Sequence, residues 1–215
     1  MDQFDGTEIL TCADHTQWEG WLADNHDRAA DVWLKIAKKS ASGTTITITE
    51  ALDGALCFGW IDSHRRSLDA DHYLQRYSPR RPKSPWSKVN VAKAEALIAS
   101  GRMRSSGFAA IAAAQSDGRW SAAYEPQRTA TCPADLNAAF VENPCARSRF
   151  DRLDRTGQYA FFLQLMKART PAERTTQLRR ILAELSEGEG WTGRKSVGDC
   201  VPGREDTVCD SACSS

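Results

Sequence analysis

The sequence has no excess of either charge. Its 28 lysine and arginine residues balance 28 aspartate and glutamate residues, so the formal net charge is zero. No overall electrostatic field therefore favours nucleic acid or an anionic membrane surface, and any electrostatic recognition must be local. Long hydrophobic runs are also missing, because no stretch approaches the roughly 18 apolar residues that a membrane-spanning helix needs. We accordingly expect a protein that neither inserts into a membrane nor binds nucleic acid.

A secretory signal is missing as well, since Met1–Asp5 is acidic and no apolar segment follows it. The seven cysteines show no disulfide pattern along most of the chain: Cys12, Cys57, Cys132 and Cys145 are scattered singly. Scattered cysteines are typical of thiols used as small apolar residues in a reducing compartment. These features predict a cytoplasmic protein.

The other three cysteines, Cys200, Cys209 and Cys213, crowd near the C-terminus. Their spacing, with no obvious fourth ligand, argues against zinc, and His64 and His72 have no partner at ligand spacing either. We expect a disulfide or free thiols in this segment, no metal site and no cofactor.

What the sequence does have is a strand-rich first half and a helix-rich second half. Alternating polarity predicts a strand at 31–39, and β-prone runs follow at 45–49, 59–65 and 72–78, the last two as a hairpin. Helical spacing and helix boundary signals predict helices at 15–24, 50–58, 86–101, 106–115, from Pro133, from Pro144, around 159–166 and from 171 to 187.

This order of elements indicates an α+β fold with a small antiparallel sheet and a helical C-terminal half. We expect a single domain over residues 1–187. Residues 188–215 are rich in glycine and poor in large apolar side chains, so we expect them to form a flexible tail.

Several segments resemble one known family. The run Glu50–Asp62, then Tyr73–Arg81, Trp86–Asn90 and Gly118–Tyr124, is similar to the YdeI/OmpD-associated, or bacteriocin-protection, family of OmdA-like proteins. The resemblance extends over roughly Ile9 to Glu187. It implies an α+β fold, a cytoplasmic and mostly bacterial class of protein, and a role in stress or antimicrobial-peptide resistance. It supplies no catalytic residues.

The segment Trp60–Asn90 is the candidate functional region. It contains seven basic residues against three acidic ones, a local charge of +4 in a chain that has none overall. Guanidinium groups bind carboxylate or phosphate, and aromatic rings stack on flat ligands or on arginine. We therefore predict a binding site for a small anionic or aromatic metabolite, formed by Trp60, Arg65, Arg76, Tyr77, Arg80, Arg81 and Trp86. The competing interpretation is a solvated hairpin whose arginines pair with nearby acids.

Two other functions remain open for the same region. One is a cofactor-independent enzyme in which Asp62, His64 and Tyr73 carry out acid–base chemistry, because Asp62 and His64 share a face if both lie on one strand. The other is a module that binds a protein partner. For Asp62 itself we expect attraction to Arg76 or Arg80 to outweigh desolvation and to keep the carboxyl ionised. The sequence leaves the oligomeric state open.

Overall fold

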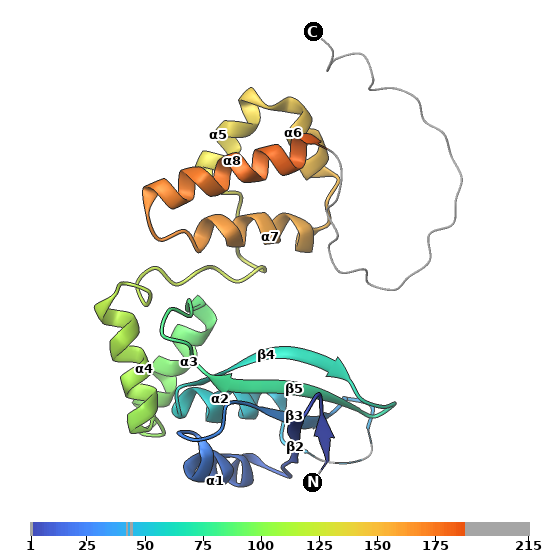
Figure 1. Cartoon of the computed structure of the whole chain (residues 1–215), viewed down its shortest axis with the longest axis vertical. Coiled ribbons are helices and arrows are strands. Elements are labelled where there is room, and N and C mark those ends of the chain that lie inside the picture. Colours follow the sequence, from blue (N-terminus) through green and yellow to red (C-terminus); the bar gives the residue numbers. More distant parts are fainter. Residues whose placement is uncertain (1, 42, 44, 188–215) are drawn as a thin grey trace.

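A computed structural model describes residues 2–41, 43 and 45–187 of the chain (Figure 1). The predicted tail at 188–215, with its three cysteines, lies outside the described residues. The elements are β1 (Gln3–Phe4), β2 (Thr7–Thr11), α1 (His15–Asn25), β3 (Val32–Ala37), α2 (Ile48–Cys57), β4 (Trp60–Ser67), β5 (His72–Pro79), α3 (Lys88–Ala99), α4 (Ser105–Ser116), α5 (Ala134–Glu142), α6 (Pro144–Asp151), α7 (Arg155–Met166) and α8 (Pro171–Glu187). The predicted α+β fold is confirmed.

The five strands form one mixed sheet in the order β1-β2-β3-β5-β4. All neighbouring strands are antiparallel except β2 and β3, which run parallel. The prediction of an antiparallel sheet is wrong for this pair, because α1 lies between the two strands and returns the chain to the same end of the sheet. The strands β1 and β2 were not predicted. Their turn carries Asp5 and Gly6 at φ values of 51 and 75°, and an Asp-Gly pair is typical of a tight hairpin turn.

Most helix boundaries follow from local capping signals. Asp14 accepts a hydrogen bond from the Gln17 amide (2.9 Å), which confirms the predicted start of α1. The N-cap of α2 is Thr47, which forms a capping box with Glu50. The predicted strand at 45–49 is therefore wrong, since its last residues already belong to the cap and first turn of α2.

The start of α3 lies later than predicted. We expected Ser84 and Pro85 to open this helix, but Ser87 is the N-cap and accepts from the Asn90 amide at 3.2 Å. Residues 80–86 consequently form an irregular loop after β5. This loop forms part of the candidate site described below.

The buried apolar side chains form two clusters. The first joins one face of the sheet to α1, α2, α3 and α4, with Trp18, Trp60, Tyr77 and Trp86 as its largest members. The second lies within α5 to α8 and contains Leu136, Phe140, Phe150, Phe161, Leu165 and Ile181. We call residues 2–116 the N-terminal unit, residues 117–133 the connecting segment and residues 134–187 the helical unit. In the view of Figure 1 the helical unit lies above α3 and β4, and the connecting segment runs between it and α4.

The connecting segment is hydrogen-bonded to both units. On one side, the Lys88 amide donates to the Tyr124 carbonyl (2.9 Å) and the Tyr124 amide donates to the Trp86 carbonyl (3.0 Å). On the other, the Tyr159 hydroxyl donates to the Glu125 carbonyl at 2.8 Å. None of the described helices is long and apolar enough to cross a membrane.

Candidate functional site

The predicted hairpin is present, and a β-bulge distorts it beside the candidate site. Strand β4 is the edge strand and pairs with β5, but the register shifts between Asp62 and Arg65. Asp62 lies opposite Tyr77, whereas Arg65 lies opposite Gln75. Strict alternation, which would put Asp62 and His64 on one face, therefore does not apply across this part of β4.

A cleft of about 890 Å³ opens at the end of this hairpin. It lies between β4, the end of β5, the 80–86 loop, α3 and the end of α7. Five of the predicted site residues line it: Asp62, His64, Arg76, Arg80 and Arg81. The structure also places there Asp31, Asn90, Tyr124 and Lys167, which the sequence analysis did not single out.

The predicted aromatic residues lie behind the cleft and not along it. Trp60 and Tyr77 are buried in the first core cluster, and the Trp60 indole donates to the His26 carbonyl at 3.1 Å. Tyr73 lies under the Arg65 guanidinium, whose Cζ is 4.5 Å from the ring centroid. Neither Tyr73 nor Arg65 lines the cleft. Tyr73 and Tyr77 are four residues apart on β5 and therefore lie on the same face of the sheet, which packs in the first core cluster.

Arg80 is the best-defined cationic group of the cleft. Its Cζ lies 3.7 Å from the centroid of the Trp86 ring, and Trp86 is itself buried. One terminal nitrogen, Nη1, donates to the Pro85 carbonyl at a long 3.4 Å. The Nε and Nη2 atoms are buried and have no hydrogen-bond partner among the described residues. Such donors are costly to bury without an acceptor.

The electrostatics of Arg80 reflect this incomplete pairing. Desolvation lowers its pKa to about 10, and the opposing attraction of Tyr124 and Asp62 does not restore the ordinary value. Arg119 adds a small like-charge repulsion. A bound anion would both supply the missing acceptor and restore the favourable charge environment.

The prediction for Asp62 is wrong in direction. Desolvation raises the pKa of its carboxyl, and a backbone hydrogen bond together with attraction by Arg80 and Arg65 only partly offsets this rise. No arginine in the described part of the chain lies within ion-pair distance of Asp62, because Arg76 pairs instead with Asp31. The sequence suggested that proximity along the chain would bring Asp62 and its arginines together, but the strands hold them apart.

The three residues proposed for acid–base chemistry do not form one group. Asp62 and His64 line the cleft, whereas Tyr73 pairs with Ile36 and Ser67 further along the sheet. A different tyrosine is electrostatically coupled to Asp62. Burial and Asp62 together raise the pKa of Tyr77 above its ordinary range, and its hydroxyl has no hydrogen-bond partner in the described chain.

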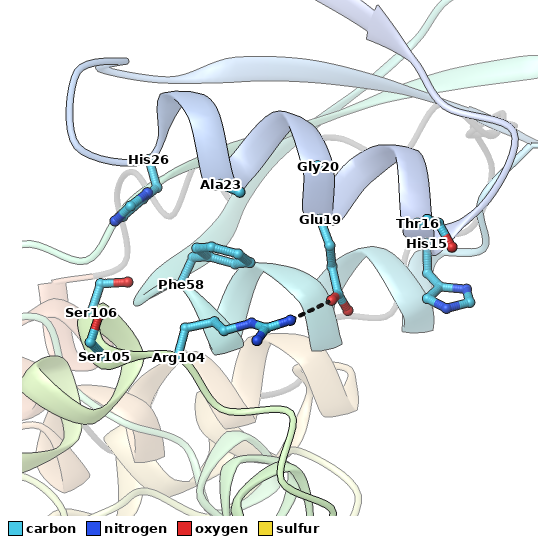
Figure 2. Close-up of a pocket in the computed structure, with 10 residues that line it drawn as sticks. All are labelled: His15, Thr16, Glu19, Gly20, Ala23, His26, Phe58, Arg104, Ser105 and Ser106. Atoms are coloured by element: carbon cyan, nitrogen blue, oxygen red, sulfur yellow. Dashed lines mark ion pairs between the residues drawn. The ribbon is translucent and has the colours of Figure 1, made fainter.

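A second cavity, of about 590 Å³, lies between α1 and the start of α4 (Figure 2). Its carboxylate, Glu19, is neutralised by Arg102 at 2.5 Å and by Arg104 at 3.9 Å. The His26 ring lies across the other end, tilted against Phe58 with ring centroids 5.3 Å apart. Because its charges are paired within the protein, this cavity offers a ligand less than the Arg80 cleft does.

Comparison with known families gives two separate matches, one mainly in the N-terminal unit and one over the helical unit. Residues 10–110 match a family described as a domain of unknown function (DUF8412). Residues 129–188 match the family described as bacteriocin-protection, YdeI or OmpD-associated. The predicted resemblance to the YdeI/OmpD-associated family is thus confirmed.

The confirmed match covers the helical unit and lies outside most of the segments on which we based the resemblance. The runs Glu50–Asp62, Tyr73–Arg81 and Trp86–Asn90 fall within the first match, and Gly118–Tyr124 falls within neither. The Arg80 cleft therefore draws most of its walls from the first matched region, and Lys167 from the second. A comparison with curated proteins and with solved structures found no match to this chain.

Proposed function

We propose that this protein, whose helical unit matches the YdeI/OmpD-associated family, binds a small anionic metabolite in the Arg80 cleft. The observation that carries the proposal is the state of Arg80: a largely buried guanidinium, stacked on Trp86, with two N–H donors that no described protein group accepts. Natural proteins rarely leave such donors unsatisfied, except where a ligand or an ion completes them.

The charges around Arg80 favour an anion. The cleft is lined by Arg76, Arg80, Arg81 and Lys167, against the carboxylates of Asp31 and Asp62. The charge of Asp31 is balanced by its ion pair with Arg76. The volume of about 890 Å³ is in the range that small-molecule sites occupy. A carboxylate or phosphate group accepting from Arg80 Nε and Nη2 would complete the geometry that guanidinium groups favour.

The same proposal includes a cytoplasmic location and a role in stress or antimicrobial resistance. The family match supports that role in general terms. The buried thiols of Cys12 and Cys57, which form no disulfide with any described cysteine, fit a reducing compartment.

Proton transfer on the bound anion is a second candidate function. It is favoured by one observation, the raised pKa of the Asp62 carboxyl in the wall of the same cleft. A group of this kind is suited to exchange protons closer to neutral pH than an ordinary aspartate does. This activity would require the binding function already proposed.

The test is a binding titration of the full chain at low ionic strength with a panel of small carboxylates and phosphates. Arg80→Gln should weaken the binding of any panel member by roughly tenfold or more, since a charge-assisted hydrogen bond is worth about 1.5–3 kcal/mol. Arg65→Gln is the matched control, because Arg65 stacks on Tyr73 and does not line the cleft. Equal loss in both variants, or no binding of any panel member, would overturn the proposal.

A further inference from the structure

A third cavity, of about 350 Å³, adjoins the Arg80 cleft where the two units meet. The two cavities share Pro85, Tyr124 and Lys167 as lining residues. The N-terminal unit contributes Lys83 and Pro85, the connecting segment contributes Tyr124, and the loop between α7 and α8 contributes Ala168 and Arg169. We call it the junction cavity.

The junction cavity differs from the cleft in chemistry. Apolar groups of Pro85, Ala122, Met166 and Ala168 form much of its wall. Among the described residues that line it, the one carboxylate, that of Asp117, is paired with arginines, and the other charged side chains are cationic. This wall offers dispersion contacts and desolvation to an apolar group, and it offers no free acceptor to a cation.

The charged residues of the junction cavity are largely paired with one another. Asp117 binds Arg119 at 2.7 Å and Arg169 at 3.7 Å. Arg119 is buried and also donates from Nη1 to the Ser84 carbonyl at 2.9 Å. These contacts tie the α7–α8 loop to the 80–86 loop, so they hold both walls of the cavity in place.

Tyr124 and Lys167 stand where the cavities meet. The backbone of Tyr124 is bonded to Trp86 and Lys88, which fixes the ring beside the cleft. Lys167 Nζ lies 5.5 Å from the centroid of that ring. Lys167 is exposed and has no ion pair with any described residue, so it is available to a ligand that passes between the cavities.

We propose that the cleft and the junction cavity form one elongated site for an organic anion with an apolar body. The acidic group binds Arg80, and the body passes beside Tyr124 and Lys167, which line both cavities, to lie against Ala122 and Met166. This inference rests on the proposed anion-binding function and adds the ligand class. It also makes the site a joint product of the two matched regions, since the apolar end needs the helical unit.

The test is a series of straight-chain alkanoates, from acetate to octanoate, titrated into the full chain by calorimetry. If the body enters the junction cavity, affinity should rise about three- to fourfold for each added methylene until the cavity is filled, from a burial gain of about 0.8 kcal/mol per methylene. Ala122→Trp, which places a large side chain in the junction cavity, should abolish this dependence on chain length. Arg80→Gln should weaken the binding of every member of the series.

Ala113→Trp is the matched control, since Ala113 is exposed on α4 and lines none of the three cavities. It should keep the chain-length dependence. Ala168→Leu, on the opposite wall of the junction cavity, replaces Ala122→Trp if the thermal midpoint shows that the latter does not fold. If affinity is independent of chain length while Arg80 is still required, the elongated site is wrong and the proposed function stands. If no alkanoate binds and Arg80→Gln changes nothing with any anion, both are wrong.

Discussion

Replacing Arg80 by methionine should stabilise the ligand-free protein while abolishing anion binding. Methionine retains an unbranched apolar chain that can lie on Trp86, but it removes the guanidinium whose Nε and Nη2 have no acceptor among the described residues. Each buried unpaired donor costs about 1–3 kcal/mol. Against this, the stacking of the cation on Trp86 contributes roughly 1–2 kcal/mol. We therefore expect a net gain of about 1–3 kcal/mol in the free energy of unfolding.

The pKa of Arg80 also predicts that Arg80→Met raises the free energy of unfolding. Folding lowers this pKa from its ordinary value to about 10, so the folded state disfavours the charged form, at a cost of roughly 3 kcal/mol at about 1.4 kcal/mol per unit. Below pH 10 the guanidinium is protonated in both states, so this cost is constant there. It decreases only as the pH rises through about 10, because the unfolded chain then binds more protons than the folded one. The gain from Arg80→Met should accordingly be the same between about pH 6 and pH 9.

The assay is urea unfolding followed by far-ultraviolet circular dichroism, which does not depend on the fluorescence of nearby Trp86. Arg76→Met is the matched control. Arg76 forms an ion pair with Asp31, so its loss leaves a half-buried carboxylate unpaired and should lower stability. If Arg80→Met lowers stability as Arg76→Met does, then Arg80 serves the fold, and the argument for a ligand is refuted.

Three further predictions concern other parts of the chain. Asp62→Asn should be at least as stable as the wild type at pH 7. The pKa of Asp62 is raised in the folded state, so the free energy of unfolding of the wild type falls as pH rises through this titration. A denaturation series across pH in which the variant is less stable than the wild type at pH 7 would contradict this. In thermal unfolding scans, Gly107→Ala should destabilise the protein by about 1–3 kcal/mol, because its Cβ would lie 2.3 Å from the Cys57 carbonyl oxygen. Gly54→Ala should destabilise it by less, because its Cβ would lie 2.8 Å from Trp18 Cδ1. Gly20→Ala, which meets open space on α1, should stabilise it by about 0.5–1 kcal/mol in the same scans. Arg174→Gln should shift the acid unfolding of the helical unit to higher pH. Arg174 lowers the pKa of Asp135, and the stabilisation from this pair is lost as pH falls through that pKa. An unchanged acid transition, followed by circular dichroism, would show that the pair contributes nothing to stability.

Much of the secondary structure could be predicted because its causes lie within one or two turns of the chain. The Asp14 cap of α1, the alternation along β3 and the sequence around Pro171 that opens α8 each depend on neighbours only a few residues away. The same locality explains the errors. The β-prone residues from Thr45 were assigned by propensity, but the Thr47 cap takes the chain into α2 instead.

The candidate site was foreseen only as a concentration of charge between Trp60 and Asn90. Which of those residues face a ligand depends on burial, and burial depends on segments far along the chain. Tyr77 of β5 is core because Trp18 of α1 packs on it, with ring centroids 5.4 Å apart, and Trp86 of the loop is core because Trp120 of the connecting segment packs on it at 4.8 Å. The bulge in β4, which breaks the alternation at Asp62, is a property of strand pairing and leaves no clear local signal.

The sequence by itself determined the type of most elements, the α+β class and the local excess of positive charge. The tertiary structure decided the rest. It paired Arg76 with Asp31, the residue just before β3, buried Asp62 deeply enough to reverse the expected shift of its pKa, and brought Tyr124 and Lys167 to the cleft. Pairing and desolvation vary with distances in space, and residues as far apart in the chain as Arg80 and Lys167 acquire such distances only when the chain folds.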